Sequence, residues 1–215
     1  ITAFTRTPFT IVAPMARNEN PPRHTREDVA RMALKNLDDE GLAELTMRRL
    51  GAALNVQPSA LYWHFPNKQS LLAELADRIV APAASARSRS ERSGQTRAQA
   101  EALRDALLTY RDGAGVVSST LGMGLGSTTP HDGLAAAIAA DGSDADVARR
   151  AAAVLLHFVL GHVSQEQQRM QYDSLGVVAP SLSLSADRGV GAAADFAFGV
   201  DLFVRGIEVS RTLPR

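Results

Sequence analysis

The sequence contains no cysteine in 215 residues. This absence excludes structural disulfides, thiolate nucleophiles and zinc sites built on cysteine. Charge of one sign is not in excess either, because 23 Lys and Arg balance 23 Asp and Glu. Binding to nucleic acid would therefore need a local cluster of cations. Hydrophobic residues make up 45% and charged residues 21%, the balance of a globular chain with room for a core.

The sequence also lacks a long hydrophobic run. The most apolar uncharged stretch, residues 151–164, contains His157 and His162 and is shorter than the roughly 20 residues that span a bilayer. Residues 9–12 form an apolar patch too brief for a secretory signal, and Met15 is a candidate native start. We therefore expect a soluble, cytoplasmic protein with no membrane partner, and a disordered extension over residues 1–24.

Helical periodicity dominates from residue 25 onward and strand-type alternation is nearly absent, so we predict an all-α fold. Thr25 is expected to begin the first helix and Gly41 to end it. A second helix is expected to begin at Thr46, with Asn55 in the turn that follows. Pro58 suits the first turn of a third short helix, which we expect to run to about residue 65.

The remaining helices are expected at wider spacing. Asn67 can cap a helix whose buried face is formed by Leu71, Leu72, Leu75 and Ile79. Residues 81–96 lack an apolar stripe and indicate a linker or a frayed helix. Further helices are expected over residues 97–112, 146–171 and 192–213, whereas the residues from Gly113 to Pro130 are expected to be mostly irregular.

One window combines cations with aromatic residues. Residues 46–68 carry Arg48, Arg49 and Lys68 and no carboxylate, and three of the eleven aromatic residues fall within residues 62–65. Cations of this kind bind phosphate, and a short second helix can present side chains to the major groove of DNA. The alternative is a small helical bundle in which the aromatic residues form the core and the arginines are solvated.

The same window, TMRRLGAALNVQPSALYWHFPNKQSLL over residues 46–72, resembles the DNA-binding domain of the TetR family of bacterial repressors. The segment LYWH followed by NK resembles the tetracycline repressor branch in particular. The resemblance implies a three-helix helix-turn-helix DNA-binding domain over residues 25–80. It also implies a helical ligand-binding and dimerisation domain over residues 81–215.

The resemblance also implies which residues contact DNA. The implied set is Arg48, Pro58, Ser59, Ala60, Tyr62, Trp63, His64 and Lys68. Arg48, Pro58 and Ser59 are expected to read bases, and Ala60, Tyr62, His64 and Lys68 to lie against phosphates. The role of Trp63 is open at this point, between packing under the recognition helix and touching DNA.

Two further segments, residues 107–114 and 157–167, resemble the effector domain of the tetracycline repressor branch. The implied ligand contacts are Val117, Thr120, Met123, Phe158, His162 and Gln165. Val117 and Gln165 stand where that branch has a histidine and an acidic residue for a magnesium–tetracycline complex. We therefore expect a bulky, uncharged, largely apolar ligand and no metal or cofactor. His162 and Glu166, four residues apart, favour a polar pair over a shared metal ion.

The last expected helix carries an apolar stripe that includes two glycines. Its members are Phe196, Gly199, Val200, Phe203, Gly206 and Ile207. The resemblance implies that this helix and the preceding one pair with a second subunit, and the alternative is packing within the chain alone. On the opposite face, Asp201 and Arg205 are expected to form an ion pair in solvent.

Together these features predict a ligand-responsive transcriptional repressor that binds a near-palindromic DNA operator as a homodimer. A small-molecule inducer is expected to release it, and control of antibiotic export or resistance is the family-based expectation. The alternatives are a small-molecule-binding protein of the same fold without specific DNA binding, and an activator. No catalytic arrangement is distinguishable in the sequence, so we do not expect an enzyme.

Overall fold

The computed structural model describes residues 24–86, 94–176 and 190–212, and these residues form helices and turns without a strand. The predicted all-α fold is confirmed. The expected extension, apart from His24, lies outside the described residues. In chain order the helices are α1 (Arg26–Glu40), α2 (Met47–Ala53), α3 (Pro58–Leu61), α4 (Lys68–Ala86), α5 (Gln95–Leu108), α6 (Gly113–Gly122), α7 (Thr129–Ala140), α8 (Ala145–Ser174) and α9 (Val190–Thr212).

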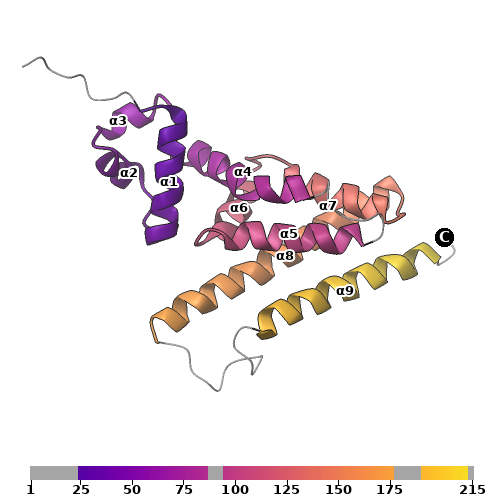
Figure 1. Ribbon diagram of the computed structural model, residues 1–215. Helices are drawn as coiled ribbons and strands as arrows, with labels where there is room; N and C mark the ends of the chain where they lie inside the picture. Colours follow the sequence, from indigo (N-terminus) through magenta and orange to yellow (C-terminus); the bar gives the residue numbers. More distant parts are fainter. Residues whose placement is uncertain (1–23, 87–93, 177–189, 213–215) are drawn as a thin grey trace, which may run out of the picture.

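The molecule has two parts, joined by α4 (Figure 1). Helices α1 to α3 lie at one end, and α4 runs from them toward α5, α6 and α7. We call the described residues 24–80 the head and the described residues from 81 onward the body. We place this division at the domain boundary predicted from the sequence, which lies inside α4.

Short-range backbone chemistry sets the ends of the first helices, as predicted. Thr25 caps α1, and its hydroxyl and the Asp28 carboxylate bind each other's backbone N–H groups. Gly41 ends α1 with φ of 87°, a conformation that favours glycine. Thr46 caps α2 through its side chain, and Asn55 takes a φ of 54° in the turn after α2.

A single apolar core holds the helices of the head together. Leu50 of α2, Leu61 of α3 and Phe65 are at most 1% exposed. Gly51 allows α3 to approach α2, because a Cβ atom there would lie 3.0 Å from the Val56 carbonyl oxygen. Helix α3 ends at Leu61, four residues earlier than predicted, since the chain then turns toward Pro66.

Helix α4 is longer than predicted. Asn67 caps it as expected, because its side-chain oxygen accepts a 2.8 Å hydrogen bond from Ser70 N. The helix continues through Ala86, so part of the segment interpreted as a linker or a frayed helix is a regular helix. Ala83 is only 3% exposed, which indicates that packing on the body supports this extra length.

The prediction of an irregular segment from Gly113 to Pro130 is wrong, because α6 and the start of α7 lie within it. Val116, Val117 and Thr120 of α6 are at most 2% exposed. Their burial stabilises a helix whose glycines have low intrinsic propensity. Gly113 is required where it stands, because a Cβ atom would lie 2.3 Å from the Leu107 carbonyl oxygen.

Helix α8 is the central helix of the body and matches the prediction closely. By length and composition it could cross a membrane, and it is the one described helix of which this is true. It packs instead against α5, α6 and α7, with Leu155, Val159 and Val163 fully buried. The apolar character of α8 is thereby explained by the core of the body.

Most of the α9 stripe that was expected to face a second subunit faces the chain's own core instead, and Gly206 is exposed. Phe196 and Val200 are each 2% exposed, and Phe196 stacks on Phe158 of α8. A Cβ atom on Gly199 would lie 2.3 Å from Phe158 Cζ, so this glycine allows α9 to pack closely on α8. For these residues, the alternative of packing within the chain is correct.

The expected ion pair of α9 has a different partner. Asp201 binds the guanidinium of Arg97 on α5. The pair therefore joins two helices of the body, and it replaces the predicted contact between Asp201 and Arg205 in solvent.

The head and the body also meet at the turn between α5 and α6. Asp112 accepts a 2.8 Å hydrogen bond from Leu42 N of the head and a 2.6 Å bond from Gln171 Nε2 of α8. Arg111 N donates to the Asp38 carboxylate at the end of α1, at 3.1 Å. Asp112 therefore connects Leu42, just after α1, to Gln171 of the central helix of the body. Arg111 adds a hydrogen bond to the end of α1 itself.

Candidate nucleic-acid interface and ligand region

The eight residues predicted to contact DNA lie on α2, α3, the turn after α3 and the start of α4. None of these eight is buried. Arg48, Ser59, Ala60, Tyr62 and Trp63 are exposed, and Pro58, His64 and Lys68 are partly exposed.

Trp63 is the most informative of these residues. Its side chain is 90% exposed, whereas the neighbouring Phe65 is fully buried in the core of the head. Packing of Trp63 under the recognition helix, one of the two alternatives left open by the sequence, is therefore wrong. Tryptophan side chains are enriched at interfaces.

The cations of this surface differ in their partners. Arg49 forms ion pairs with Glu40 and Glu44 of the head. Across the described part of the chain, Arg48 and Lys68 have no ion pair with a carboxylate. Arg48 and Lys68 are thus the cations of this surface that the fold leaves available for an external anion.

Lys68 also lies at a favourable point of the backbone. It is the first residue of α4, where helix N–H groups and the positive end of the helix dipole favour a phosphate. Helix α4 has 19 residues, and its first turn carries no acidic side chain that would repel one. The start of α4 therefore favours an anion, and Arg48 on α2 is a second available cation of the head.

The structure does not bring the six predicted ligand residues into one cavity. Val117 and Thr120 are buried on α6, and the Thr120 hydroxyl donates to the Val117 carbonyl at 2.9 Å. Phe158 and His162 lie on α8 against Phe196 of α9, with ring centroids 5.3–5.7 Å apart. The remaining two residues, Met123 and Gln165, are exposed to solvent.

A small, partly open space adjoins Val117 and Thr120. Its volume is about 10 Å³, and it lies between α4, α6 and the loop that joins α6 to α7. Ser127 N of that loop donates a 2.8 Å hydrogen bond to the Asp77 carboxylate of α4. The loop therefore forms one wall of this space while it is bonded to α4.

The predicted pairing of His162 with Glu166 is wrong. Glu166 binds Arg104 of α5 at 2.6 Å, and both side chains are mostly buried. His162 Nε2 lies 3.0 Å from the Ala192 carbonyl oxygen of α9. The two residues therefore join α8 to different helices.

Gln99 of α5 was not singled out from the sequence. It is 3% exposed, and its Nε2 donates a 3.2 Å hydrogen bond to the Ala83 carbonyl of α4. Its Oε1 is buried without a hydrogen-bond partner among the described residues, a costly state that calls for a donor. Nothing in the sequence distinguishes this glutamine from the others, because its distinctive property is burial, which the sequence does not show.

A larger cleft of about 180 Å³ lies between α5, α7 and α9. Arg97, Asp141 and Glu208 line it together with apolar residues of α7 and α9. Asp141 accepts hydrogen bonds from Gln95 N and Thr96 N, so it serves as a cap for α5. Both of these side chains of the cleft therefore have structural partners, because Asp141 caps α5 and Arg97 binds Asp201.

The capped short helices, the close approach of α3 to α2 and the cationic surface define a helix-turn-helix DNA-binding protein. Residues 31–75 match the family model for bacterial regulatory proteins of the tetR family, and residues 89–211 match the tetracyclin repressor-like C-terminal domain. The chain belongs to the tetR family. It is a ligand-responsive DNA-binding repressor and not an enzyme.

Individual relatives agree with this assignment. The tetracycline repressor protein class E of Escherichia coli is 36% identical over 197 residues, which cover 86% of this chain and 90% of the relative. The crystal structure of BioQ with its natural double-stranded DNA operator is 36% identical, with a TM-score of 0.68, and covers 86% of this chain and 98% of that one. A substituted form of TetR from Acinetobacter baumannii AYE, in complex with minocycline, is 28% identical with a TM-score of 0.67, covering 88% and 99%.

Proposed function

We propose that two copies of this chain bind a near-palindromic operator and leave it when a small-molecule inducer binds the body. The observation that carries the proposal is the exposed surface of the head, where Arg48, Lys68 and Trp63 have no ion-pair or core partner among the described residues. One head contacts one major groove. Two heads related by symmetry match two half-sites about 34 Å apart along the duplex.

Within each head, the proposed contacts divide into two kinds. Arg48, Pro58 and Ser59 read base edges, and Ala60, Tyr62, His64 and Lys68 lie against the phosphate backbone. The exposure of Trp63 favours contact with the duplex for this residue as well.

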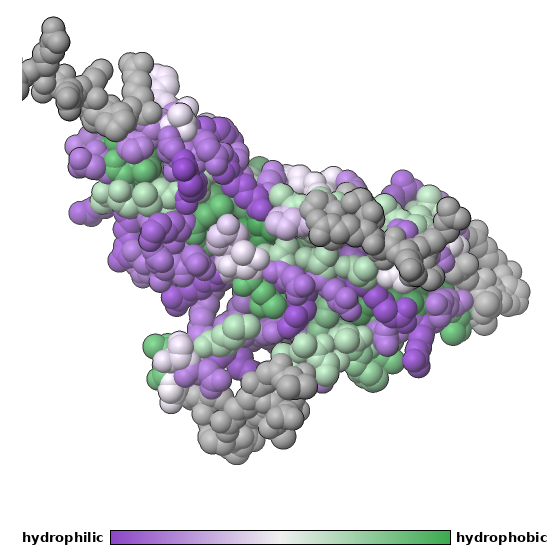
Figure 2. Space-filling model, viewed as in Figure 1, coloured by the Kyte–Doolittle hydropathy of each residue, from purple (hydrophilic) through white to green (hydrophobic). Residues whose placement is uncertain are grey.

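A homodimer is supported by an apolar face of α9 that is different from the predicted stripe. Phe198, Leu202 and Val209 recur on one side of the helix and are 65%, 55% and 58% exposed. Val154 of α8 is 59% exposed. Hydrophobic residues gather along α9, whereas the head is largely hydrophilic (Figure 2). A face of this kind is costly in water, and a second copy would cover it.

The proposed inducer site adjoins Val117 and Thr120. A pocket for a drug-sized ligand needs about 300 Å³ or more, far above the space of about 10 Å³ in this structure. A bulky ligand therefore requires this space to widen, and a movement of the loop between α6 and α7 would widen it. That movement breaks the bond from Ser127 to Asp77 on α4, the helix that enters the head.

This arrangement couples the inducer to DNA by population shift. A ligand that binds only the opened state favours it over the closed state, and α4 then holds the head differently. A coupling of about 1–3 kcal/mol would lower operator affinity about 5- to 150-fold.

We further propose that the protein acts in the cytoplasm and that its target gene encodes antibiotic export or resistance. The relatives that are named tetracycline repressors support this direction. The departures at Val117 and Gln165 favour an inducer other than magnesium-chelated tetracycline.

One experiment tests these points together. Purified protein selects duplexes from a random pool, and the selection is repeated with a panel of polyketide-like compounds. We expect a palindrome to be enriched and to be lost with at least one compound. Weak association, equal on all sequences, would instead support the small-molecule-binding protein without specific DNA binding. Sedimentation of the free protein as a monomer would contradict the homodimer.

A further inference from the structure

The turn after α3 carries Tyr62, Trp63 and His64, three of the proposed DNA contacts. On the side of α3, His64 N and Phe65 N each donate to the Leu61 carbonyl at 3.0 Å. On the other side, the carbonyl of His64 accepts a hydrogen bond from Arg26 Nη1 at 3.0 Å. A side chain of α1 therefore ties this turn to the rest of the head.

Arg26 is held from three directions. Its guanidinium carbon lies 4.3 Å from the centre of the buried Phe65 ring, a cation–π contact. Its Nη2 and Nε donate to one oxygen of Glu74, at 2.8 and 3.3 Å. The planar guanidinium presents its N–H donors in a fixed fork while its face lies on a ring, and the compact ammonium of lysine does not reproduce this geometry.

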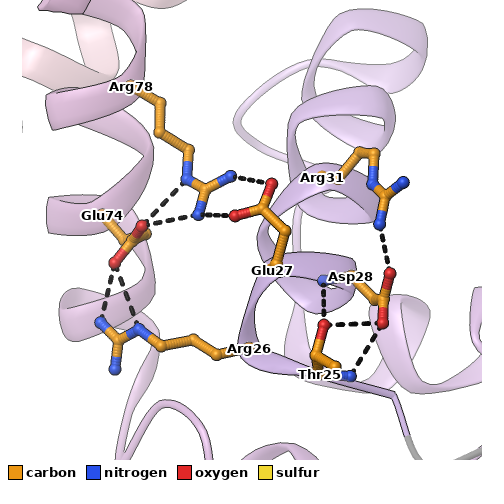
Figure 3. A network of polar contacts seen from close by, with 7 residues as sticks. All are labelled: Thr25, Arg26, Glu27, Asp28, Arg31, Glu74 and Arg78. Atoms are coloured by element: carbon orange, nitrogen blue, oxygen red, sulfur yellow. Dashed lines mark hydrogen bonds and ion pairs between the residues drawn. The ribbon is translucent and has the colours of Figure 1, made fainter.

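Glu74 is itself fixed by Arg78, which also binds the carboxylate of Glu27 with two bonds of 2.7 Å (Figure 3). The hydrogen bond from Arg26 lowers the pKa of Glu74, so this carboxylate stays charged at neutral pH. The four residues form a chain of ion pairs between α1 and α4. Arg26 is the member of the chain that contacts the recognition turn.

We propose that Arg26 is a positioning residue for operator recognition: it fixes the turn of Tyr62, Trp63 and His64 relative to α4 and does not itself bind phosphate. This inference rests on the proposed DNA-binding function of the head. The side chain of Arg26 is 56% exposed, so direct contact with phosphate is the competing role. The two roles differ in their dependence on salt.

The test compares wild type with Arg26→Gln, Arg26→Lys and the control Arg31→Gln on the selected operator over a series of salt concentrations. Arg31 lies on the same helix and pairs locally with Asp28, so its loss removes the same charge without touching the turn. We expect Arg26→Gln to lower affinity about tenfold with an unchanged salt slope. Arg26→Lys should not restore affinity, and Arg31→Gln should change it less than twofold.

Trp63 gives a second measurement, because it is the single tryptophan of the chain. In the free protein, Arg26→Gln should increase the fast motion of Trp63 in time-resolved fluorescence anisotropy, and Arg31→Gln should not. Glu74→Gln should also lower operator affinity and increase the fast motion of Trp63, but by less than Arg26→Gln. This variant makes the protein more cationic, which by itself would strengthen binding to DNA, so a loss of operator affinity would be diagnostic.

Two results would overturn the inference. One is a salt slope reduced by about 0.9 in Arg26→Gln with affinity restored by Arg26→Lys, which identifies a phosphate contact. The other is equal operator affinity of Arg26→Gln and wild type. If wild type itself prefers no duplex, the proposed function fails, and that outcome is distinct from both.

Discussion

The head and the body use their side chains in opposite ways. In the head, the residues proposed to meet DNA, such as Arg48 and Trp63, are exposed, and a different set, including Leu50 and Phe65, forms the core. In the body, the ligand candidates Thr120, Phe158 and His162 are themselves part of the packing. Binding and stability are therefore separable in the head and inseparable in the body, and substitutions can test this difference.

The largest effect is expected from Leu202→Arg in the body. It places a charge on the exposed apolar face of α9 and should convert the dimer to monomers, since burying an unpaired charge is strongly unfavourable. Operator affinity should fall at least about 100-fold, because each monomer contacts one half-site. Sedimentation and gel shift measure the two effects. The matched control is Glu208→Arg on the same helix. A dimeric Leu202→Arg protein would refute the proposed interface.

Arg48→Ala in the head should weaken the best operator by about 1–3 kcal/mol and relax one base position. Lys68→Ala should instead weaken all sequences alike and reduce the salt slope by about one unit. Both variants should keep the melting temperature of wild type, because neither side chain has an ion pair to lose within the described part of the chain. Unchanged operator affinity in Arg48→Ala would show that this residue is not a base reader.

Gly199→Ala in the body should lower the free energy of unfolding by about 1–3 kcal/mol, because the new methyl group meets the Phe158 ring. Gly161→Ala on α8 is the matched control, since nothing lies within 4 Å of a Cβ atom there. The control should stabilise by up to about 1 kcal/mol through helix propensity. Urea unfolding of both variants measures these changes. An unchanged free energy of unfolding in Gly199→Ala would contradict the close packing of α8 and α9.

The smallest effect is expected on stability when the pH is lowered. Hydrogen bonds from Arg26 to Glu74 and from Arg78 to Glu27 lower the pKa values of these carboxyls below the ordinary 4.5. Their contribution to stability is complete above pH 4.5 and is lost as pH falls through the lowered values. Urea unfolding between about pH 7 and pH 3 should therefore show a smaller acid-induced loss for Glu74→Gln than for wild type. Parallel curves over that whole range would show that the network contributes nothing.

The parts of the fold that could be predicted from the sequence depend on neighbours in the chain. Thr25, Gly41, Thr46, Asn55 and Asn67 act through atoms within a few residues, and all five have the predicted role. The segment that forms α6 was misjudged for the opposite reason. Its glycines disfavour a helix locally, and the burial that stabilises it comes from α4 and α8, which no local pattern reports.

The same distinction applies to the sites. The proposed DNA contacts lie within residues 48–68, so a contiguous motif could identify them, and the structure adds the exposure of Trp63. The ligand candidates lie on α6, just after α6 and on α8, and their surroundings come from α4 and α9, which are distant in the chain. The α9 stripe was assigned to the wrong partner because periodicity identifies an apolar face without saying what covers it.

Helix α4 has a mechanical consequence. With 19 residues at about 1.5 Å each, it is a rod about 28 Å long, with one end in the body and the other at the recognition surface. A tilt of about 5° about the body end of such a rod would displace the far end by about 2.5 Å. With opposite tilts in two subunits, the reading helices would separate by about 5 Å, against a groove repeat of about 34 Å. A tilt of about 5° at the body end of α4 would thus be enough to shift two heads relative to the repeat of the duplex.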